Sequence, residues 1–92
     1  MTAHDVIARN FKKRKEYLVS RIAITTTSGK IFDGDEASQD RIMRAVQIAA
    51  ITELTETQWK LANNEIVMVT LDELKEALAL AGQEMSRIWL EQ

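Results

Sequence analysis

The chain has 92 residues, 46% of them hydrophobic and 28% charged, a balance typical of one small folded domain and unlike a disordered segment. It contains no cysteine, which excludes disulfides, thiolate metal sites and thiol catalysis, and no apolar run long enough to suggest a membrane span. The net charge of −2 is unevenly distributed, because residues 1–21 are basic overall and residues 22–92 are acidic.

Residues 3–19 are predicted to form a helix in which Ile7, Phe11 and Leu18 share one face. Arg14 interrupts this thin apolar stripe, so the helix is either a marginal amphipathic arm or one that needs a partner to be stable. We therefore divide the chain into an N-terminal basic helical arm, residues 1–20, and a single α+β domain, residues 21–92. The charge of the arm suits an anionic partner, the acidic body of a neighbouring subunit, or a solvated helix face.

A β-hairpin is predicted next. Ile22, Ile24 and Thr26 lie on one face of a β-branched stretch by the two-residue period of a strand. Ser28-Gly29 supplies the turn, and the chain returns through residues 30–32.

The second helix is predicted over about residues 37–52, with Ser38 as its N-cap. Its apolar stripe follows the spacing i, i+3, i+4, i+7 and consists of Ile42, Ala45, Val46 and Ala49. Ile48 and Ile51 widen this face, which predicts a central helix packed on more than one side.

A second hairpin is predicted around a two-residue turn at Asn63-Asn64. In that register Leu61 faces Ile66 and Trp59 faces Met68, so these four side chains would form one apolar face of the sheet. The prediction is specific enough to be tested by the strand register.

The last helix has the strongest start signal, a capping box from Thr70 to Glu73 in which each side chain would satisfy a backbone amide of the other residue. A seam with 3-4-3-4-3 spacing then follows, made of Leu71, Leu74, Leu78, Ala81, Met85 and Ile88. It would pack either on the sheet of the same chain or against a second copy. The whole pattern predicts an α+β fold of the order helix–β-hairpin–helix–β-hairpin–helix, with a small antiparallel sheet packed against helices.

We expect no catalytic, cofactor or metal site. The only histidine, His4, has no cluster around it, and the acids of residues 33–40 lack the spacing of a calcium loop and suit a turn followed by a helix start. Four consecutive bases could contact a polyanion, but they spread around a helix and the pI is about 5.4, which disfavours a dedicated nucleic-acid binder. These bases are Lys12, Lys13, Arg14 and Lys15.

In order and spacing, the segments Gly29–Asp35, Ala37–Ile42, Thr57–Asn64 and Val69–Leu74 resemble a family of phage-encoded domains of unknown function, found in tail proteins and near tail-fibre genes. The similarity extends over about residues 14–90. It implies a bacteriophage or prophage protein of the host cytoplasm during assembly, or of the virion tail, without catalytic residues.

The resemblance implies a non-catalytic structural or tail-fibre assembly role through contacts with phage tail or tail-fibre proteins. A homo-oligomer is a further possibility; we expect no membrane association. The alternative is a small phage accessory protein that binds nucleic acid or another polyanion through the basic helix. The candidate protein interface lies on the two terminal helices and comprises Ile7, Phe11, Leu18, Leu78, Met85, Ile88 and Trp89.

Overall fold

The computed structural model describes residues 3–91, with side chains from residue 12 onward. It confirms the predicted order of elements and the α+β class. The elements are α1 (Ala3–Ser20), β1 (Ala23–Thr25), β2 (Ile31–Asp33), α2 (Glu36–Thr52), β3 (Glu56–Lys60), β4 (Ile66–Thr70) and α3 (Leu71–Leu90). The strands form two separate antiparallel two-stranded sheets, β1-β2 and β3-β4.

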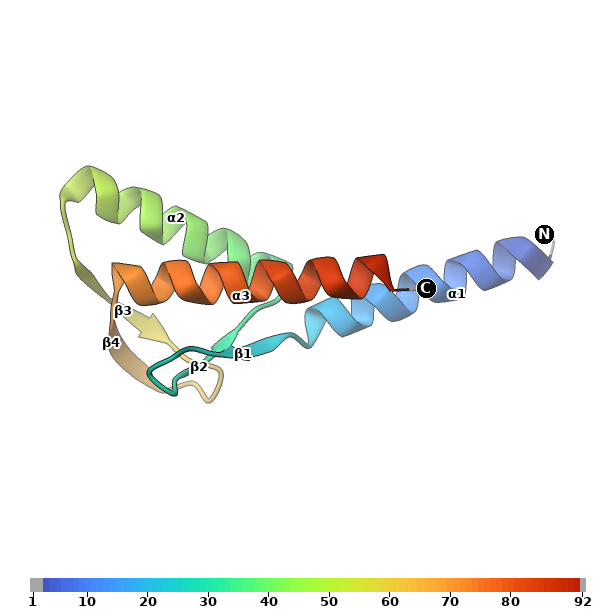
Figure 1. The fold of residues 1–92 in the computed structure, drawn as a ribbon, viewed down its shortest axis with the longest axis horizontal. Helices are drawn as coiled ribbons and strands as arrows, with labels where there is room; N and C mark the ends of the chain where they lie inside the picture. Colours follow the sequence, from blue (N-terminus) through green and yellow to red (C-terminus); the bar gives the residue numbers. More distant parts are fainter. Residues whose placement is uncertain (1–2, 92) are drawn as a thin grey trace.

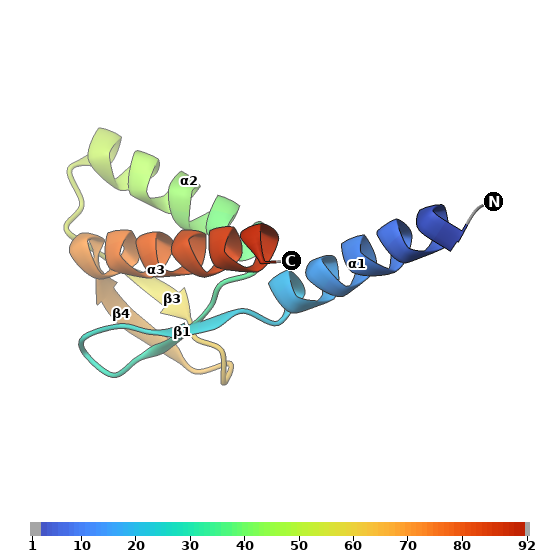
Figure 2. The ribbon, with the colours of Figure 1, turned by 45° about the vertical axis from the view of Figure 1, so that its right-hand side comes forward.

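Helix α3 lies at the centre of the molecule. Figures 1 and 2 show α2 along one side of α3 and the two hairpins along the other, with α1 leading away past the end of α3. A two-stranded hairpin is marginally stable by itself, so each depends on the helix that covers it.

The core is formed where the hairpins and α2 meet α3. Its four largest fully buried side chains come from four different elements and are Phe32, Ile42, Val69 and Leu74. The predicted inner face of the first strand is confirmed, since Ile22, Ile24 and Thr26 are all buried. Thr26 also begins the predicted turn, in which Gly29 has a φ of 88° and its amide donates to the Thr26 carbonyl at 2.9 Å.

Gly34 lies where the chain leaves β2 and passes close to α3. A Cβ at this position would stand 2.6 Å from Ile22 Cγ2 and 3.0 Å from Ala81 Cβ. The Gly34 amide donates to the Ile22 carbonyl at 2.8 Å, and its carbonyl accepts from the buried side-chain amide of Gln39 at 2.9 Å. The absence of a side chain here lets the hairpin approach α3 closely.

The predicted stripe of α2 is confirmed, with Ile42 and Ala49 buried and Ala45 and Val46 packed against the core. The prediction that Ile48 and Ile51 are also packed is wrong for this chain, because their exposed fractions are 51% and 81%. α2 is therefore covered on one side only.

The predicted start of α2 is also displaced. Asp35 is the N-cap residue, and Ser38 lies within the first turn. The Ser38 hydroxyl donates to the Asp35 carboxylate. The Gln39 amide donates to the Asp35 carbonyl at 2.9 Å, so the backbone bonding of the helix begins at Asp35 and not at Ser38.

The second hairpin has a register one residue away from the predicted one. Trp59 pairs with Val67 and Lys60 with Ile66. The loop has three residues, 62–64, because the Leu61 amide donates to the Glu65 carbonyl at 2.8 Å. Within this loop Asn64 alone adopts a positive φ, of 70°, and its amide donates to the Leu61 carbonyl at 2.9 Å.

A shift of one residue reverses the faces of a strand. Trp59, Val67 and Val69 therefore face the core side together with the buried Leu61. Ile66 and Met68, predicted to be in the core, lie on the outer face with exposed fractions of 65% and 53%.

The α3 seam packs inside the chain. Leu74, Ala81 and Ile88 are buried, and Leu78 and Met85 are partly buried against the same core. Of the two predicted packing partners of this seam, the structure shows the core of the same chain.

Candidate interaction surfaces

Half of the predicted capping box is confirmed. The Thr70 hydroxyl accepts a hydrogen bond from the Glu73 amide at 3.1 Å. The Glu73 carboxylate does not return to Thr70 but reaches the turn of the first hairpin, where it accepts from the Thr26 hydroxyl at 2.8 Å and from the Ser28 hydroxyl. Lys30 Nζ lies 3.3 Å from the other carboxylate oxygen.

The same turn is held by a second acid of α3, one helical turn further on. Glu76 accepts from both the amide and the hydroxyl of Thr27 at 2.7 Å. Burial disfavours the charged form of Glu73, but the hydrogen bonds from Ser28, Thr26 and Lys30 outweigh it and lower the pKa of the carboxyl below its usual value. These groups satisfy one another, so they form a structural clamp between α3 and the hairpin.

An open groove of about 680 Å³ lies between β1, the end of α1 and α3. Apolar side chains from all three elements line it, namely Leu18, Ile24, Leu80 and Ile88. Gln83, Glu84 and Arg87 also line the groove. The Arg87 guanidinium forms ion pairs with two carboxylates, with N–O distances of 2.5 Å to Glu84 and 2.6 Å to Glu91.

The free edge of β1 borders this groove. The Gly34 amide donates to Ile22 and the Thr26 amide to Lys30, so the bonded positions of β1 are the even-numbered ones. Because hydrogen-bonding directions alternate along an antiparallel strand, the amides and carbonyls of Ala23 and Thr25 point away from β2. Both residues also line the groove. An extended segment could add to β1 here and cover the apolar lining.

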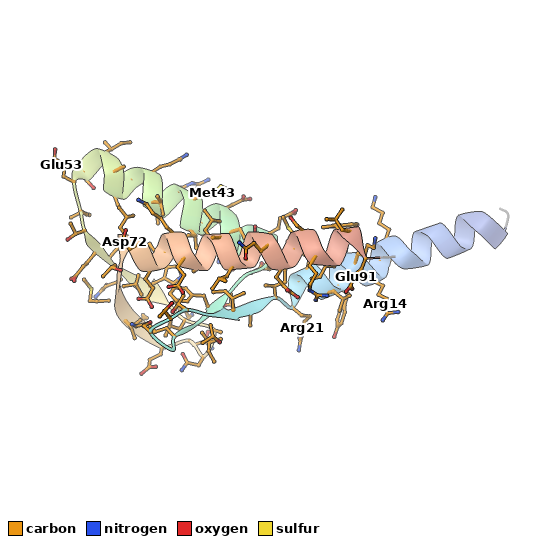
Figure 3. All side chains as sticks on the ribbon, viewed as in Figure 1. Arg14, Arg21, Met43, Glu53, Asp72 and Glu91 are labelled. Carbon is orange, nitrogen blue, oxygen red and sulfur yellow. The ribbon has the colours of Figure 1, made fainter. Side chains whose placement is uncertain are left out.

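The four consecutive bases of α1, Lys12 to Lys15, differ in their surroundings. The side chains of Lys12, Lys13 and Arg14 are exposed, as Figure 3 illustrates for Arg14. Lys15 instead donates to the Trp89 carbonyl at 2.9 Å, and its Nζ lies 5.9 Å from the centre of the Trp89 ring. A cation at the C-terminal end of α3 complements the helix dipole, so Lys15 helps to join α1 to α3.

The predicted interface residues fall into different environments. The side chains of Ile7 and Phe11 lie outside the described residues. Leu18 borders the groove, and Trp89 has an exposed fraction of 41%. Ile88 is 4% exposed and therefore belongs to the core, as do the partly buried Leu78 and Met85.

A further apolar surface lies on α2, on the side away from α3. We call it the outer α2 face; its large apolar residues are Met43, Ile48 and Ile51, with exposed fractions of 44%, 51% and 81%, and Leu54, in the loop that follows the helix, is 52% exposed. Figure 3 labels Met43 on this helix and Glu53, the C-cap residue, just beyond its end.

Sequence reasoning did not identify the clamp, the groove or the outer α2 face as surfaces. The Glu73/Glu76 pair at i, i+3 indicates that two acids share one face of α3, but no local pattern identifies residues 26–28 as their partners. The groove depends on the position of α1 relative to β1, for which no local pattern exists.

Within residues 12–91, no group of three or more His, Asp or Glu side chains could hold a metal ion. Over the part of the chain that the structure describes, no helix is long and apolar enough to cross a membrane.

Comparison with known proteins gives one family. Neither a curated protein nor a solved structure shows a significant match to the chain. A family model described as a domain of unknown function, DUF4376, matches residues 5–89. This match covers nearly the whole sequence, and it includes both hairpins and most of the three helices. The chain therefore belongs to the DUF4376 family.

Proposed function

We propose that the protein is a bacteriophage or prophage tail-associated structural or tail-fibre assembly protein, which acts by protein–protein contacts and not by catalysis. The tail association rests on the sequence resemblance of residues 14–90 described above. Its partners are phage tail or tail-fibre proteins, met in the host cytoplasm during assembly or in the virion tail.

The groove beside the free edge of β1 is the observation that supports a role in protein–protein contacts. Strand addition uses main-chain hydrogen bonds for affinity and alternate side-chain positions for specificity. Ala23 and Thr25 offer the main-chain groups, and Leu18 and Leu80 offer an apolar surface for every second side chain of the added segment. The polar and charged side chains of Gln83, Glu84 and Arg87 beside it suit a polar rim.

The test is co-purification of the tagged chain with the tail and tail-fibre proteins encoded beside it. Ala23→Pro removes the outward amide while leaving the bonds between β1 and β2, since proline is tolerated at strand edges. Leu18→Asp places a charge beside the apolar lining. Both variants should lose the captured protein at least tenfold.

Ile66→Ser is the matched control, because Ile66 is an exposed apolar residue on the outer face of the other hairpin. It should capture the partner as well as the unmodified chain does. If no tail protein is captured, or if Ala23→Pro and Leu18→Asp capture it normally while their circular dichroism is unchanged, the proposal fails.

A second candidate is polyanion binding through α1, favoured by the exposed side chains of Lys12, Lys13 and Arg14. Binding to a DNA or RNA duplex would then weaken steeply with salt, because phosphate neutralisation releases counterions. Replacement of these three bases by glutamate should abolish a low-salt gel shift, and Lys75→Glu on the exposed surface of α3 should not. No shift of DNA or RNA at low salt would exclude this function.

A further inference from the structure

The edges of the two sheets meet at one point and then separate. The Ala62 amide, just after β3, donates to the carbonyl of Ile31, the first residue of β2, at 3.0 Å. If this contact continued as an antiparallel ladder, Asp33 would be bonded to Lys60. Within residues 12–91 no backbone hydrogen bond joins these two residues, and β2 and β3 belong to separate sheets. A gap therefore lies between the sheets beyond Ile31.

Main-chain groups of both strands face this gap. The Gly34 amide is bonded on the β1 side and the Leu61 amide on the β4 side. Because bonding directions alternate along a strand, the amides and carbonyls of Asp33 and Lys60 point towards each other's strand. Polar main-chain groups require partners, from water or from a ligand. The gap thus presents two donors and two acceptors at fixed positions.

A pocket of about 400 Å³ occupies the gap, a size within the range of about 300–1,000 Å³ for small-molecule sites. Trp59 and Leu61 line it from the core side of β3, and Leu61 is buried while Trp59 is partly buried. The other lining residues are polar and come from β2, α2, β3 and the loop after β3, namely Asp33, Ser38, Arg41, Gln58, Lys60 and Asn64. An apolar contact with converging polar groups is the usual composition of a ligand site.

The charged groups of this pocket are two bases and one acid. Arg41 and Lys60 are exposed, and neither of them takes part in an ion pair within residues 12–91, with Asp33 or with any other acid. An anionic group between the two bases would pair with both, and a guanidinium can bond a carboxylate or phosphate through two parallel hydrogen bonds. Asp33 accepts hydrogen bonds, and Gln58 and Asn64 both accept and donate, which suits a ligand with several hydroxyl groups.

We propose that this pocket binds an acidic sugar, which is a hexose-sized ring with several hydroxyl groups and one carboxylate or phosphate. The anionic group pairs with Arg41 and Lys60, and the hydroxyls bond to Asp33 and the main-chain groups of the gap. The C–H groups of the ring pack on Trp59, whose aromatic face carries partial negative charge. The lining residues differ from those of the β1 groove, so the inference stands independently of the proposed function.

The first experiment titrates the isotope-labelled full chain with acidic sugars (glucuronate, galacturonate and glucose 6-phosphate) up to about 10 mM, followed by NMR. The Trp59 indole and the Lys60 amide should shift, whereas the indole of Trp89, on α3, should not. Glucose alone and inorganic phosphate alone should bind at least tenfold more weakly, since each supplies only part of the contacts. No shift with any acidic sugar, or an equal response to inorganic phosphate, would overturn the proposal.

The second experiment removes the counter-charges one at a time. Arg41→Gln and Lys60→Gln should each weaken binding of the acidic sugar at least tenfold. Arg44→Gln on α2 and Lys75→Gln on α3 are the matched controls, because both residues are exposed and lie outside the pocket lining. Circular dichroism establishes that each variant is folded. Unchanged affinity in Arg41→Gln and Lys60→Gln, or AMP binding at least tenfold tighter than ribose 5-phosphate, would contradict the assignment to an acidic sugar.

Discussion

The carboxylate of Glu73, in the first turn of α3, lies 2.8 Å from the hydroxyl of Thr26, at the turn of the β1-β2 hairpin. The two residues are 47 positions apart in the sequence, and Lys30 joins them from the other side of the turn. One partly buried acid thereby fixes the position of the first hairpin on the last helix.

Glu73→Gln should lower the free energy of unfolding by about 1.5–3 kcal/mol near neutral pH, because hydrogen bonds to a charged group in a partly buried site are lost. The pKa of Glu73 is lower in the folded protein than in the unfolded chain. The ionised carboxylate therefore stabilises the fold fully above the pKa of the unfolded chain, and this stabilisation is lost as the pH falls through the pKa of the folded protein. Urea unfolding of both proteins should therefore converge under acidic conditions. Glu16→Gln, an exposed acid on α1, should change little at any pH.

The two glycines Gly34 and Gly82 should respond in opposite directions to alanine. Gly34→Ala places a methyl group 2.6 Å from Ile22 and should destabilise the fold by about 1–3 kcal/mol through overpacking. Gly82 lies within α3, and a Cβ there would meet no atom within 4 Å, so Gly82→Ala should stabilise by up to about 1 kcal/mol. Thermal denaturation measures both, and a stabilising Gly34→Ala would refute the close approach.

The loop of the second hairpin predicts a difference between its two asparagines. Asn64 alone has a positive φ, so Asn64→Gly should be neutral or stabilising and Asn64→Ala should cost about 1 kcal/mol. Asn63 instead accepts a hydrogen bond from the Glu65 amide through its side chain at 2.9 Å. Asn63→Gly should therefore destabilise, whereas a two-residue turn with both asparagines at positive φ would make it favourable. Urea unfolding of the three variants distinguishes the two loops.

Lys15→Ala should loosen the attachment of α1 to α3 by about 0.5–1 kcal/mol, because it removes the bond to the Trp89 carbonyl and the contact with its ring. Amide hydrogen exchange in residues 12–20 should accelerate, and the Trp89 fluorescence should shift. The neighbouring exposed Lys13→Ala is the control. Equal exchange in both variants would show that Lys15 carries no part of this contact.

Local patterns in the sequence predicted the type and order of all five units, because helix stripes and strand alternation are set by burial against one core. The stripe of α2 from Ile42 to Ala49 and the inner face of Ile22 and Ile24 are examples. The predicted register of the second hairpin is wrong because Asn63-Asn64 suits both a two-residue and a three-residue loop. That choice depends on which strand face can reach α3.

The candidate surfaces were harder to predict. Ile48 and Ile51 extend the apolar stripe of α2, and sequence alone cannot distinguish a second packed side from an exposed one. The Glu73 side chain satisfies the spacing of a capping box, yet a distant turn with two hydroxyls and a lysine offers it more partners. The partners of Glu73 lie 43 to 47 positions away in the sequence, beyond the reach of any local pattern.

The central place of α3 has a consequence for biosynthesis. Both hairpins, α1 and α2 pack mainly on this helix, which follows all of them in the sequence and is therefore translated after them. A nascent chain that ends before Leu71 has two hairpins and two helices with their apolar faces uncovered. We therefore expect this domain to fold only after Leu90 has emerged from the ribosome, in one late step, with the earlier segments open to chaperones until then.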